Sequence, residues 1–598
     1  MSKELKDRNS ISDQYKWNLD HIYADDNSFE IELQKVLQKI EAIKNYKNDF
    51  CEDGEKLYNA LNEIIKVEEK TSRLYAYAHM KYDQNTKNEK YQNYKNKAMT
   101  AYNNLNNSTS FMLPAIIELG EEKLKEYIKE NEELSFYEHF FDNIMRQKDH
   151  YLSADEEKIL ALAGEVTQSS ENIFSMLNNA DLEFPLIEDE NGEEIRLTHG
   201  RYIDLLKNED REVRKEAFNG MHGEYEKLDN TFAAVLDSSV KGDIFYARAR
   251  KYESSLEASL DDDNISVDVY DNLINSISDN LAPLHEYMEL KKEMLELDEL
   301  HIYDTYTPLI KEIDLKFEYE ESKDIIKKAL QPLGEDYVSI VDKAFNSGWI
   351  DVYENKGKRS GAYSSGCYGV HPFILMNYTK DISNLFTLIH EMGHALHSYY
   401  TNKNQPYIYS KYKIFVAEVA STLNENLLVD YMLNNAESRE EKLYLLNYFL
   451  EGFRGTVYRQ TMFAEFEKLI HQEVEKGAGL TSQSMQQKYN NLNKKYFGDQ
   501  LAIDKKLDYE WARIPHFYYN FYVYKYATGY SAATALAEKI KNEGGEAAER
   551  YLDFLRAGGS DYPLNILKNA GVNMEKPLVI ENAVDKFSRY LKKLKDLI

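Results

Sequence analysis

Residues 385–400 read LFTLIHEMGHALHSYY. This stretch has the pattern H-E-x-x-H, in which His390 and His394 stand one helical turn apart. An apolar body of leucine, phenylalanine and isoleucine precedes them and predicts a buried helix. Two imidazoles on one helix face can bind a single zinc ion at about 2.0–2.1 Å. Glu391 adjoins that face, where it can hold a metal-bound water and take its proton.

A catalytic zinc site needs a third protein ligand and one open position. His397 does not qualify, because it lies about 10.5 Å from His390 along a straight helix. Another class of zinc peptidases places a histidine at the position that Tyr400 occupies here, so that pattern fails as well. The third ligand is therefore expected on a different segment.

Residues 413–432, KIFVAEVASTLNENLLVDYM, predict a second buried helix. Glu418 and Glu425 are two turns apart and project from the same side of it. A carboxylate on an otherwise apolar stretch is costly unless it is paired or binds a cation. We therefore predict Glu418 as the third ligand of one zinc ion per chain. Glu425 is predicted to accept the free ring N–H of a ligand histidine.

Residues 513–533, RIPHFYYNFYVYKYATGYSAA, are rich in tyrosine and are expected to form a helix. On that helix His516, Tyr519 and Tyr526 share a face, Tyr522 lies near it, and Tyr524 points elsewhere. Hydroxyl and imidazole groups are suitable donors to the oxyanion that forms during peptide hydrolysis. The alternative is that the aromatic side chains simply form a core, and the pattern does not decide between the tyrosines.

The rest of the chain predicts a mainly α fold. It has only 10 proline and 26 glycine residues among 598, so helices are rarely interrupted. Asn191-Gly192 lies between two apolar runs and predicts a hairpin near residues 182–198. The glycine-rich stretch 357–378 ends in a predicted strand at Phe373–Tyr378. We expect an N-terminal helical region over residues 1–200, ending in the hairpin, and a catalytic metallopeptidase region over residues 201–598.

Composition limits the partners and the compartment. The net charge of −30 repels phosphate backbones, so nucleic acid is not expected as a partner. Cys51 and Cys367 have no C-x-x-C partners, and two cysteines allow no disulfide framework, which favours a reducing cytoplasm. The N-terminus lacks an apolar signal core, and no stretch is long and apolar enough to enter a membrane. The sequence predicts no oligomeric state.

Three segments together identify a resemblance. HEMGHALH at 390–397, FVAEVASTLNE at 415–425 and HFYYNFYVYKYATG at 516–529 are similar to the oligoendopeptidase F family, relatives of thimet oligopeptidase. YKWNLDHIYADD at 15–26 and HIYDTYTPL at 301–309 also resemble that family. The resemblance extends over essentially the whole chain and is most specific between Gly361 and Glu425.

The resemblance implies a large helical body with a deep substrate channel and a small β element beside the zinc helix. It implies an endopeptidase of the HExxH gluzincin type that cleaves short oligopeptides, with Glu418 as a ligand and Glu425 supporting. It places the family's C-terminal histidine at His516 and leaves the tyrosines unassigned. It also implies that an extended substrate pairs with the stretch Gly361, Ala362 and Tyr363. The alternatives are a carboxypeptidase or dipeptidase on the same plan, or an inactive peptide-binding relative.

Overall fold

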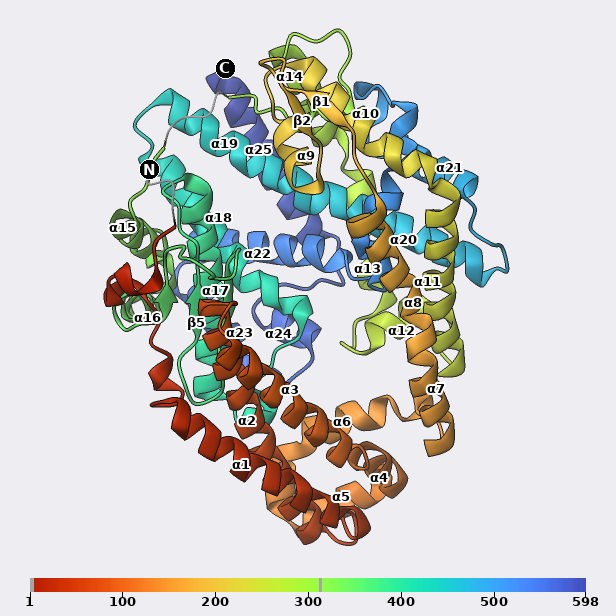
Figure 1. Cartoon of the computed structure of the whole chain (residues 1–598), viewed down its shortest axis with the longest axis vertical. Coiled ribbons are helices and arrows are strands. Elements are labelled where there is room, and N and C mark those ends of the chain that lie inside the picture. The colour runs from red at the N-terminus through yellow and green to blue at the C-terminus, as the bar shows by residue number, and fades with distance from the viewer. Residues whose placement is uncertain (1–4, 311–314) are drawn as a thin grey trace. The chain divides into compact units, whose positions relative to one another are not determined.

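The computed structural model describes residues 5–310 and 315–598 and divides into two compact units (Figure 1). Each unit is assembled from three separate parts of the chain. Unit 1 comprises Met1–Asp149, Asp314–Tyr431 and Leu536–Val572, and unit 2 comprises His150–Ile313, Met432–Ala535 and Asn573–Ile598. Neither unit begins or ends at residue 200, where the sequence predicts a boundary, because contacts between distant segments define the units. The predicted sequence regions therefore stay a prediction and do not coincide with the compact units.

Helices make up most of both units, so the predicted mainly α class is confirmed. The helices within unit 1 are α1 (Asp26–Ile43), α2 (Gly54–Gln84), α3 (Glu89–Thr109), α4 (Met112–Leu119), α5 (Glu121–Glu130), α6 (Glu138–Arg146), α15 (Tyr319–Ala329), α16 (Glu335–Asn346), α17 (Ile382–Asn404), α23 (Gly545–Ala557) and α24 (Pro563–Asn569). Those within unit 2 are α7 (Ala154–Thr167), α8 (Ser169–Met176), α9 (His199–Leu206), α10 (Arg211–Lys227), α11 (Asp229–Ala249), α12 (Ser255–Asp261), α13 (Val267–Asp279), α14 (Ala282–Met294), α19 (Arg439–Phe453), α20 (Arg459–Glu475), α21 (Ser482–Phe497) and α25 (Leu578–Leu597). Two further helices contain a unit boundary: α18 (Ile414–Asn435) and α22 (Tyr524–Glu543).

The core of unit 1 begins at α1, α2 and α3, which pack against one another (Figure 1). Apolar residues of α1 recur every three or four positions, and Leu33, Val36, Ile40 and Ile43 are all buried. The same apolar cluster continues to Phe373, which lies just before the metal helix in sequence. The short strand that begins at Phe373 therefore packs against this helical core.

A three-stranded sheet in unit 1 has the order β3 (Ile350–Asp351), β5 (Phe373–Leu375), β4 (Tyr363–Ser365). β5 is fully buried, pairs in parallel with β3 and antiparallel with β4, and corresponds to the predicted strand. Both β4 and β5 contact α17, so the predicted small β element beside that helix is confirmed. Within the described ranges β4 pairs with β5 alone and is an edge strand.

Unit 2 contains the predicted hairpin, formed by β1 (Leu186–Glu188) and β2 (Glu194–Arg196). Gly192 has a φ of 76°, which supplies the left-handed backbone that the turn requires. The capping boxes Ser153–Glu156 and Ser438–Glu441 start α7 and α19. Local sequence signals therefore determine where these elements begin.

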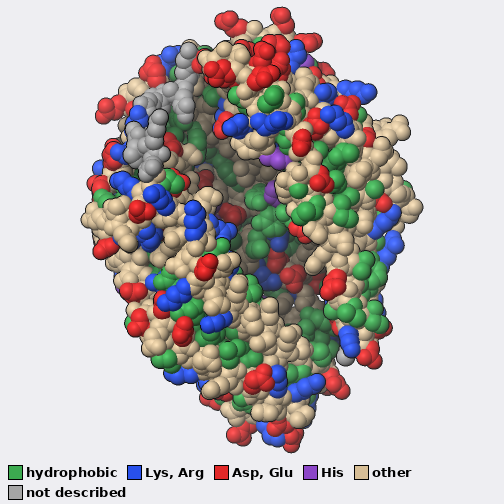
Figure 2. All heavy atoms as spheres, viewed as in Figure 1, with side chains coloured by type: hydrophobic (Ala, Val, Ile, Leu, Met, Phe, Trp, Pro, Cys, Tyr) green, Lys and Arg blue, Asp and Glu red, His purple; other side chains and the backbone are tan. Residues whose placement is uncertain are grey.

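Charged side chains of both signs are interspersed over the face drawn in Figure 2. In the part of the chain that the structure describes, no helix has the length and apolar character needed to cross a bilayer. The cytoplasmic location and the substrate channel implied by the resemblance stay predictions.

Candidate metal centre

α17 carries the H-E-x-x-H pattern, and its start is fixed locally. The Asp381 carboxylate accepts a hydrogen bond from the Asn384 backbone N–H and caps the helix. Most of the helix is buried, including Leu388, Ile389 and Met392. His390 and His394 lie one turn apart on one face of this helix, and Glu391 adjoins that face.

α18 crosses α17 at very short range, and Gly393 makes this possible. A Cβ atom added at Gly393 would lie 2.5 Å from the Ser421 Cα and 2.7 Å from the Ala420 carbonyl oxygen. Both neighbours are backbone atoms and cannot move aside by a rotamer change. The absence of a side chain at Gly393 therefore lets the second helix approach closely enough to present Glu418, a role that the sequence analysis missed.

The three predicted ligands lie together. The Glu418 Oε2 is 3.6 Å from His390 Nε2 and 3.7 Å from His394 Nε2. One ligand atom from each residue lies within 4.8 Å of the other two, and no other such group of three occurs among the described residues. The Ser421 hydroxyl donates to the Glu418 carbonyl oxygen at 3.0 Å and also lies 3.3 Å from its Oε2. Two nitrogen donors and one carboxylate converging on a point are compatible with a zinc ion.

Glu425 lies on the far side of the His390 ring. The ring Nδ1 donates to the Glu425 Oε1 at 2.5 Å, which leaves Nε2 directed toward Glu418. Burial acts to lower the pKa of His390, but the Glu425 hydrogen bond and the neighbouring carboxylates raise it to about 9. Burial lowers the pKa of His394 to about 4, with the charge of His390 acting in the same direction. Two histidines one turn apart thus have different electrostatic surroundings.

Glu391 is 8% exposed. Burial raises the pKa of its carboxyl group to about 7, His390 opposes that rise, and Glu418 reinforces it. The backbone of Ser364 on β4 interacts with the same carboxyl group and favours its ionised form. A carboxyl group whose pKa is near neutrality is well matched to taking and returning a proton.

His397 and Tyr400, the two positions that the sequence excludes as metal ligands, lie away from the three predicted ligands. His397 is almost fully buried, its ring stacks on Tyr412 with centroids 3.7 Å apart, and burial lowers its pKa to about 3. Tyr400 is buried and its ring stacks on that of Tyr337. Both residues pack in the interior of unit 1.

The stretch predicted to bind an extended substrate lies on and just before β4. Gly361 has a φ of +84°, and its carbonyl oxygen accepts from the Asn377 amide at 2.8 Å. Ala362 is half-buried, and the Tyr363 hydroxyl donates to the buried Asp83 at 2.8 Å. The stretch is thus held at the Gly361 carbonyl oxygen and at the Tyr363 side chain, and the outer backbone edge of β4 has no strand partner among the described residues.

In unit 2, three tyrosines of the tyrosine-rich segment gather around His516. The His516 ring centroid is 5.7 Å from that of Tyr519, 6.3 Å from Tyr522 and 5.8 Å from Tyr526. The Tyr526 hydroxyl also lies 3.4 Å from the His516 Nε2. We call His516, Tyr519, Tyr522 and Tyr526 the ring cluster. Tyr524 is not part of it, because its side chain is fully buried beside Tyr270.

The prediction of one continuous helix through this segment is wrong. Residues Pro515–Tyr518 form a short 3₁₀ turn, and α22 begins only at Tyr524. Between them Asn520 and Phe521 have φ values of 43° and 58°, which end any right-handed helix. The ring cluster is therefore assembled by a turn, and no pattern in the sequence identifies two successive left-handed residues.

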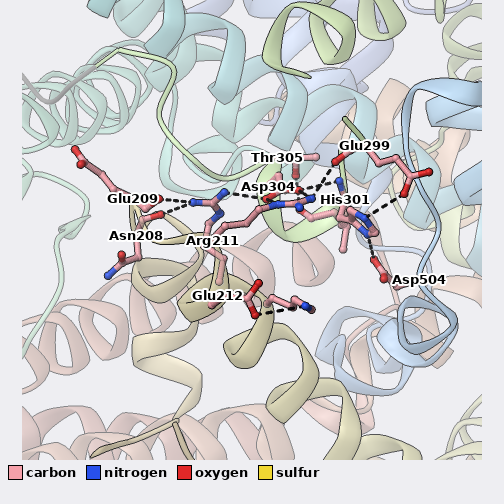
Figure 3. Close-up of polar contacts among 12 residues, drawn as sticks. Asn208, Glu209, Arg211, Glu212, Glu299, His301, Asp304, Thr305 and Asp504 are labelled. Atoms are coloured by element: carbon pink, nitrogen blue, oxygen red, sulfur yellow. Dashed lines mark hydrogen bonds and ion pairs between the residues drawn. The ribbon is translucent and has the colours of Figure 1, made fainter. Parts of the chain in front are cut away.

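The segment 301–309, which also carried the resemblance, is anchored in unit 2 by Asp304 (Figure 3). Asp304 is fully buried, and its two carboxylate oxygens accept hydrogen bonds from Arg211 and Arg214 at 2.9–3.1 Å. The His301 ring pairs with Asp504 at 2.8 Å (Figure 3). Arg211 also donates to the Glu299 carbonyl oxygen, so the segment is held at both its carboxylate and its backbone. These contacts give the segment 301–309 a structural role.

Comparison with known proteins gives two family matches. Residues 204–585 match the family described as Peptidase family M3. Residues 116–184 match the one described as Oligopeptidase F. The first match includes α17, α18 and the segment of the ring cluster.

Individual relatives match along the full chain. The oligopeptidase PepF of Bacillus subtilis is 50% identical over 597 residues, which cover 100% of this chain and 89% of that protein. The group B oligopeptidase PepB of Streptococcus agalactiae is 41% identical and covers 99% of this chain and 98% of its own length. Among solved structures, a putative peptidase from Chlamydophila abortus has a TM-score of 0.93 at 35% identity, covering 100% of both chains. Oligoendopeptidase-F from Enterococcus faecium has a TM-score of 0.75 at 39% identity, covering 96% of this chain and 99% of its own.

Proposed function

The chain belongs to peptidase family M3, and from that premise we propose that it is a zinc-dependent endopeptidase that cleaves internal bonds of short oligopeptides. The observation that carries this proposal is the convergence of His390, His394 and Glu418 within 4.8 Å. The buried Glu391 lies on α17, the helix that carries both histidines. The printed names of the relatives, oligopeptidase and oligoendopeptidase, support short peptides as substrates.

His390, His394 and Glu418 would hold the ion. The donor set of two imidazoles and a carboxylate fits zinc, and the Glu425 hydrogen bond fixes the His390 ring with Nε2 free. When bound, zinc supplies Lewis acidity that polarises a carbonyl group and makes a water molecule easier to deprotonate near pH 7.

Glu391 acts as the general base and then as the general acid. It accepts the proton of the attacking water and delivers it to the leaving amine. Its burial beside the two ligand histidines, next to the Ser364 backbone of β4, supports this role. His516 and one hydroxyl of the ring cluster serve as donors to the oxyanion.

Substrate binding is proposed at the edge of β4. Gly361, Ala362 and Tyr363 would pair with an extended peptide by backbone hydrogen bonds, as an added strand. Two features support this: β4 is an edge strand, and it contacts the helix that carries Glu391. An added strand at this edge would lie next to the general base.

The decisive experiment is Glu391→Gln. Glutamine keeps the size of the side chain but cannot accept the proton, so turnover of a quenched internal peptide should fall by at least about 10²-fold. Zinc content, measured by mass spectrometry of the purified protein, should stay near one per chain. Near-normal turnover in this variant would contradict the general-base role.

Product mapping separates the alternatives. Fragments cut at internal bonds support an endopeptidase, whereas release of only terminal residues or dipeptides would replace it with a carboxypeptidase or dipeptidase. A zinc-loaded protein that binds peptides and cleaves none of a broad library would instead be an inactive peptide-binding relative. Each result is read from the same digest by mass spectrometry.

A further inference from the structure

The turn that carries the ring cluster has an unusual backbone. Asn520 and Phe521 both lie in the left-handed region, at φ values of 43° and 58°. Such a conformation is strained for a residue other than glycine, and it is rare for a bulky residue. The turn can therefore persist only where its surroundings hold it in place.

Two side chains from other helices hold this turn by its backbone. The Glu467 carboxylate on α20 accepts the Phe521 N–H at 2.6 Å. The Ser259 hydroxyl on α12 donates to the Asn520 carbonyl oxygen at 2.7 Å. Phe521 is 1% exposed and its ring centroid lies 4.3 Å from that of His471, so packing reinforces both hydrogen bonds.

Among the described residues, the Phe521 N–H is the hydrogen-bond donor to the Glu467 side chain, and His471 is its oppositely charged neighbour. The Glu467 side chain is fully buried, and its Oε2 has no hydrogen-bond partner among the described residues. The neighbouring His471 is already engaged, with Nε2 3.2 Å from Asp243 and Nδ1 2.9 Å from the Glu467 carbonyl oxygen. A buried carboxyl group is costly unless its hydrogen bonds offset that cost. The hydrogen bond that the Glu467 side chain accepts from the Phe521 amide offsets part of this cost.

Burial raises the pKa of Glu467 to about 8, with His471 and the Phe521 amide opposing that rise. A glutamine at this position would have the same shape and the same acceptor oxygen, while leucine would have neither acceptor nor charge. The two substitutions therefore separate the acceptor from the rest of the side chain.

We propose that Glu467 is a positioning residue for peptide hydrolysis, which locks the Asn520–Phe521 turn and thereby fixes where His516 and the tyrosines of the ring cluster point. This inference rests on the proposed function, in which the ring cluster donates to the oxyanion. The turn lies directly between Tyr519 and Tyr522, so a change in its backbone reorients both neighbours. Donors to a transition state must be held closely, because a shift of about 1 Å can cost as much as 10²-fold in rate.

The test compares Glu467→Leu with Glu467→Gln in the full-length, zinc-loaded protein. Glu467→Leu should lower kcat at least tenfold and leave KM within about twofold, because the lost interaction acts in the transition state. Zinc content should not change, since all three ligands lie in unit 1. Glu467→Gln should retain kcat within about threefold, because it keeps the acceptor for the Phe521 N–H.

Leu450→Ala is the matched control for lost stability. Leu450 is fully buried on α19 in unit 2, and its truncation leaves a cavity without removing a hydrogen bond from the turn. It should lower the melting temperature and leave kcat unchanged. A Glu467→Leu variant that loses no more kcat than Leu450→Ala would overturn the inference, and so would a Glu467→Gln variant as impaired as the leucine one.

Ser259→Ala gives a second test that does not depend on a buried carboxyl group. If Glu467→Leu fails to fold, Ser259→Ala should still lower kcat at least threefold with KM and zinc content unchanged, and unchanged kcat would overturn the inference. The wild-type assay separates this inference from the proposed function. A wild-type protein without peptidase activity would overturn both, whereas an active wild type with unaffected Glu467→Leu and Ser259→Ala variants would overturn only the inference.

Discussion

At the scale of single residues, the metal centre depends on side chains that orient the ligands. Glu425 contributes no ligand atom, yet its Oε1 holds the His390 Nδ1 at 2.5 Å and determines which ring nitrogen is free. The sequence predicts this pair, because Glu418 and Glu425 lie two turns apart on one helix face. The ionic interaction is part buried, so water does not easily replace the carboxylate.

Glu425→Ala is expected to weaken zinc binding by about 10–100-fold, the usual cost of losing the partner of a ligand histidine. Zinc affinity is measured by competition with a chromophoric chelator. The control is Glu440→Ala, an exposed glutamate in the first turn of α19, which should bind zinc as the wild type does. Equal zinc affinity in the Glu425 and Glu440 variants would show that Glu425 does not support the metal site.

At the scale of helices and turns, the sequence predicts what local spacing determines. The faces of α17 and α18 follow from residue spacing, and the side chains of His390, His394, Glu418 and Glu425 lie together as that spacing predicts. Their role as a metal centre stays a prediction. The turn at Asn520 was not predictable, because its conformation depends on Glu467 and Ser259 from distant helices. The role of Gly393 was missed for the same reason: the helix that excludes a side chain there lies elsewhere in the sequence.

Gly393→Ala is expected to push α17 and α18 apart. The added methyl group would meet backbone atoms at 2.5–2.8 Å, so one helix must move and separate Glu418 from the two histidines. We expect a loss of stability of about 1–3 kcal/mol and a measurable loss of bound zinc. The melting temperature measures the loss of stability, and the metal content of the purified protein measures the loss of zinc.

Gly452→Ala is the matched control for that substitution. Gly452 also lies inside a helix, α19, and apart from the helix's own adjacent backbone no atom of the described residues lies within 4 Å of the position that its Cβ would occupy. Alanine there should raise stability by about 0.5–1 kcal/mol, because it restricts the unfolded chain. If Gly393→Ala and Gly452→Ala change the melting temperature and the zinc content equally, the close approach of α17 and α18 does not depend on Gly393.

At the scale of the whole molecule, two compact units carry different parts of the proposed chemistry. His390, His394, Glu418, Glu425 and Glu391 belong to unit 1, and the ring cluster belongs to unit 2. Each unit gathers segments that are hundreds of residues apart. Periodicity and turn signals report only local structure, so this division could not be read from the sequence.

Removal of zinc by a chelator is expected to destabilise unit 1 selectively. A ligand that binds only the folded state stabilises it by about 4 kcal/mol at a thousandfold excess over its dissociation constant. Amide hydrogen exchange should therefore accelerate in α17 while α20 in unit 2 keeps its protection. Equal acceleration in both helices would contradict a metal site confined to unit 1.

Acid should destabilise unit 2 through Glu451. Burial acts to raise the pKa of its carboxyl group, but Arg454 and Lys291 lower it to about 2. Because the unfolded value is about 4.3, Glu451 stabilises the fold fully above that pH, and the contribution is lost as the pH falls through about 2. Glu451→Gln should flatten the acid dependence of hydrogen exchange in α19 between about pH 5 and pH 2. The exposed Glu440→Gln should retain the wild-type slope.

The edge position of β4 bears on which peptides the protein can accept. Main-chain hydrogen bonds do not distinguish one amino acid from another, so a peptide paired with Gly361, Ala362 and Tyr363 as proposed would be bound by backbone groups that every sequence shares. Proline is the exception, since it has no N–H to offer. An enzyme of this design would be tolerant of side-chain identity and would discriminate first by whether a peptide can lie fully extended.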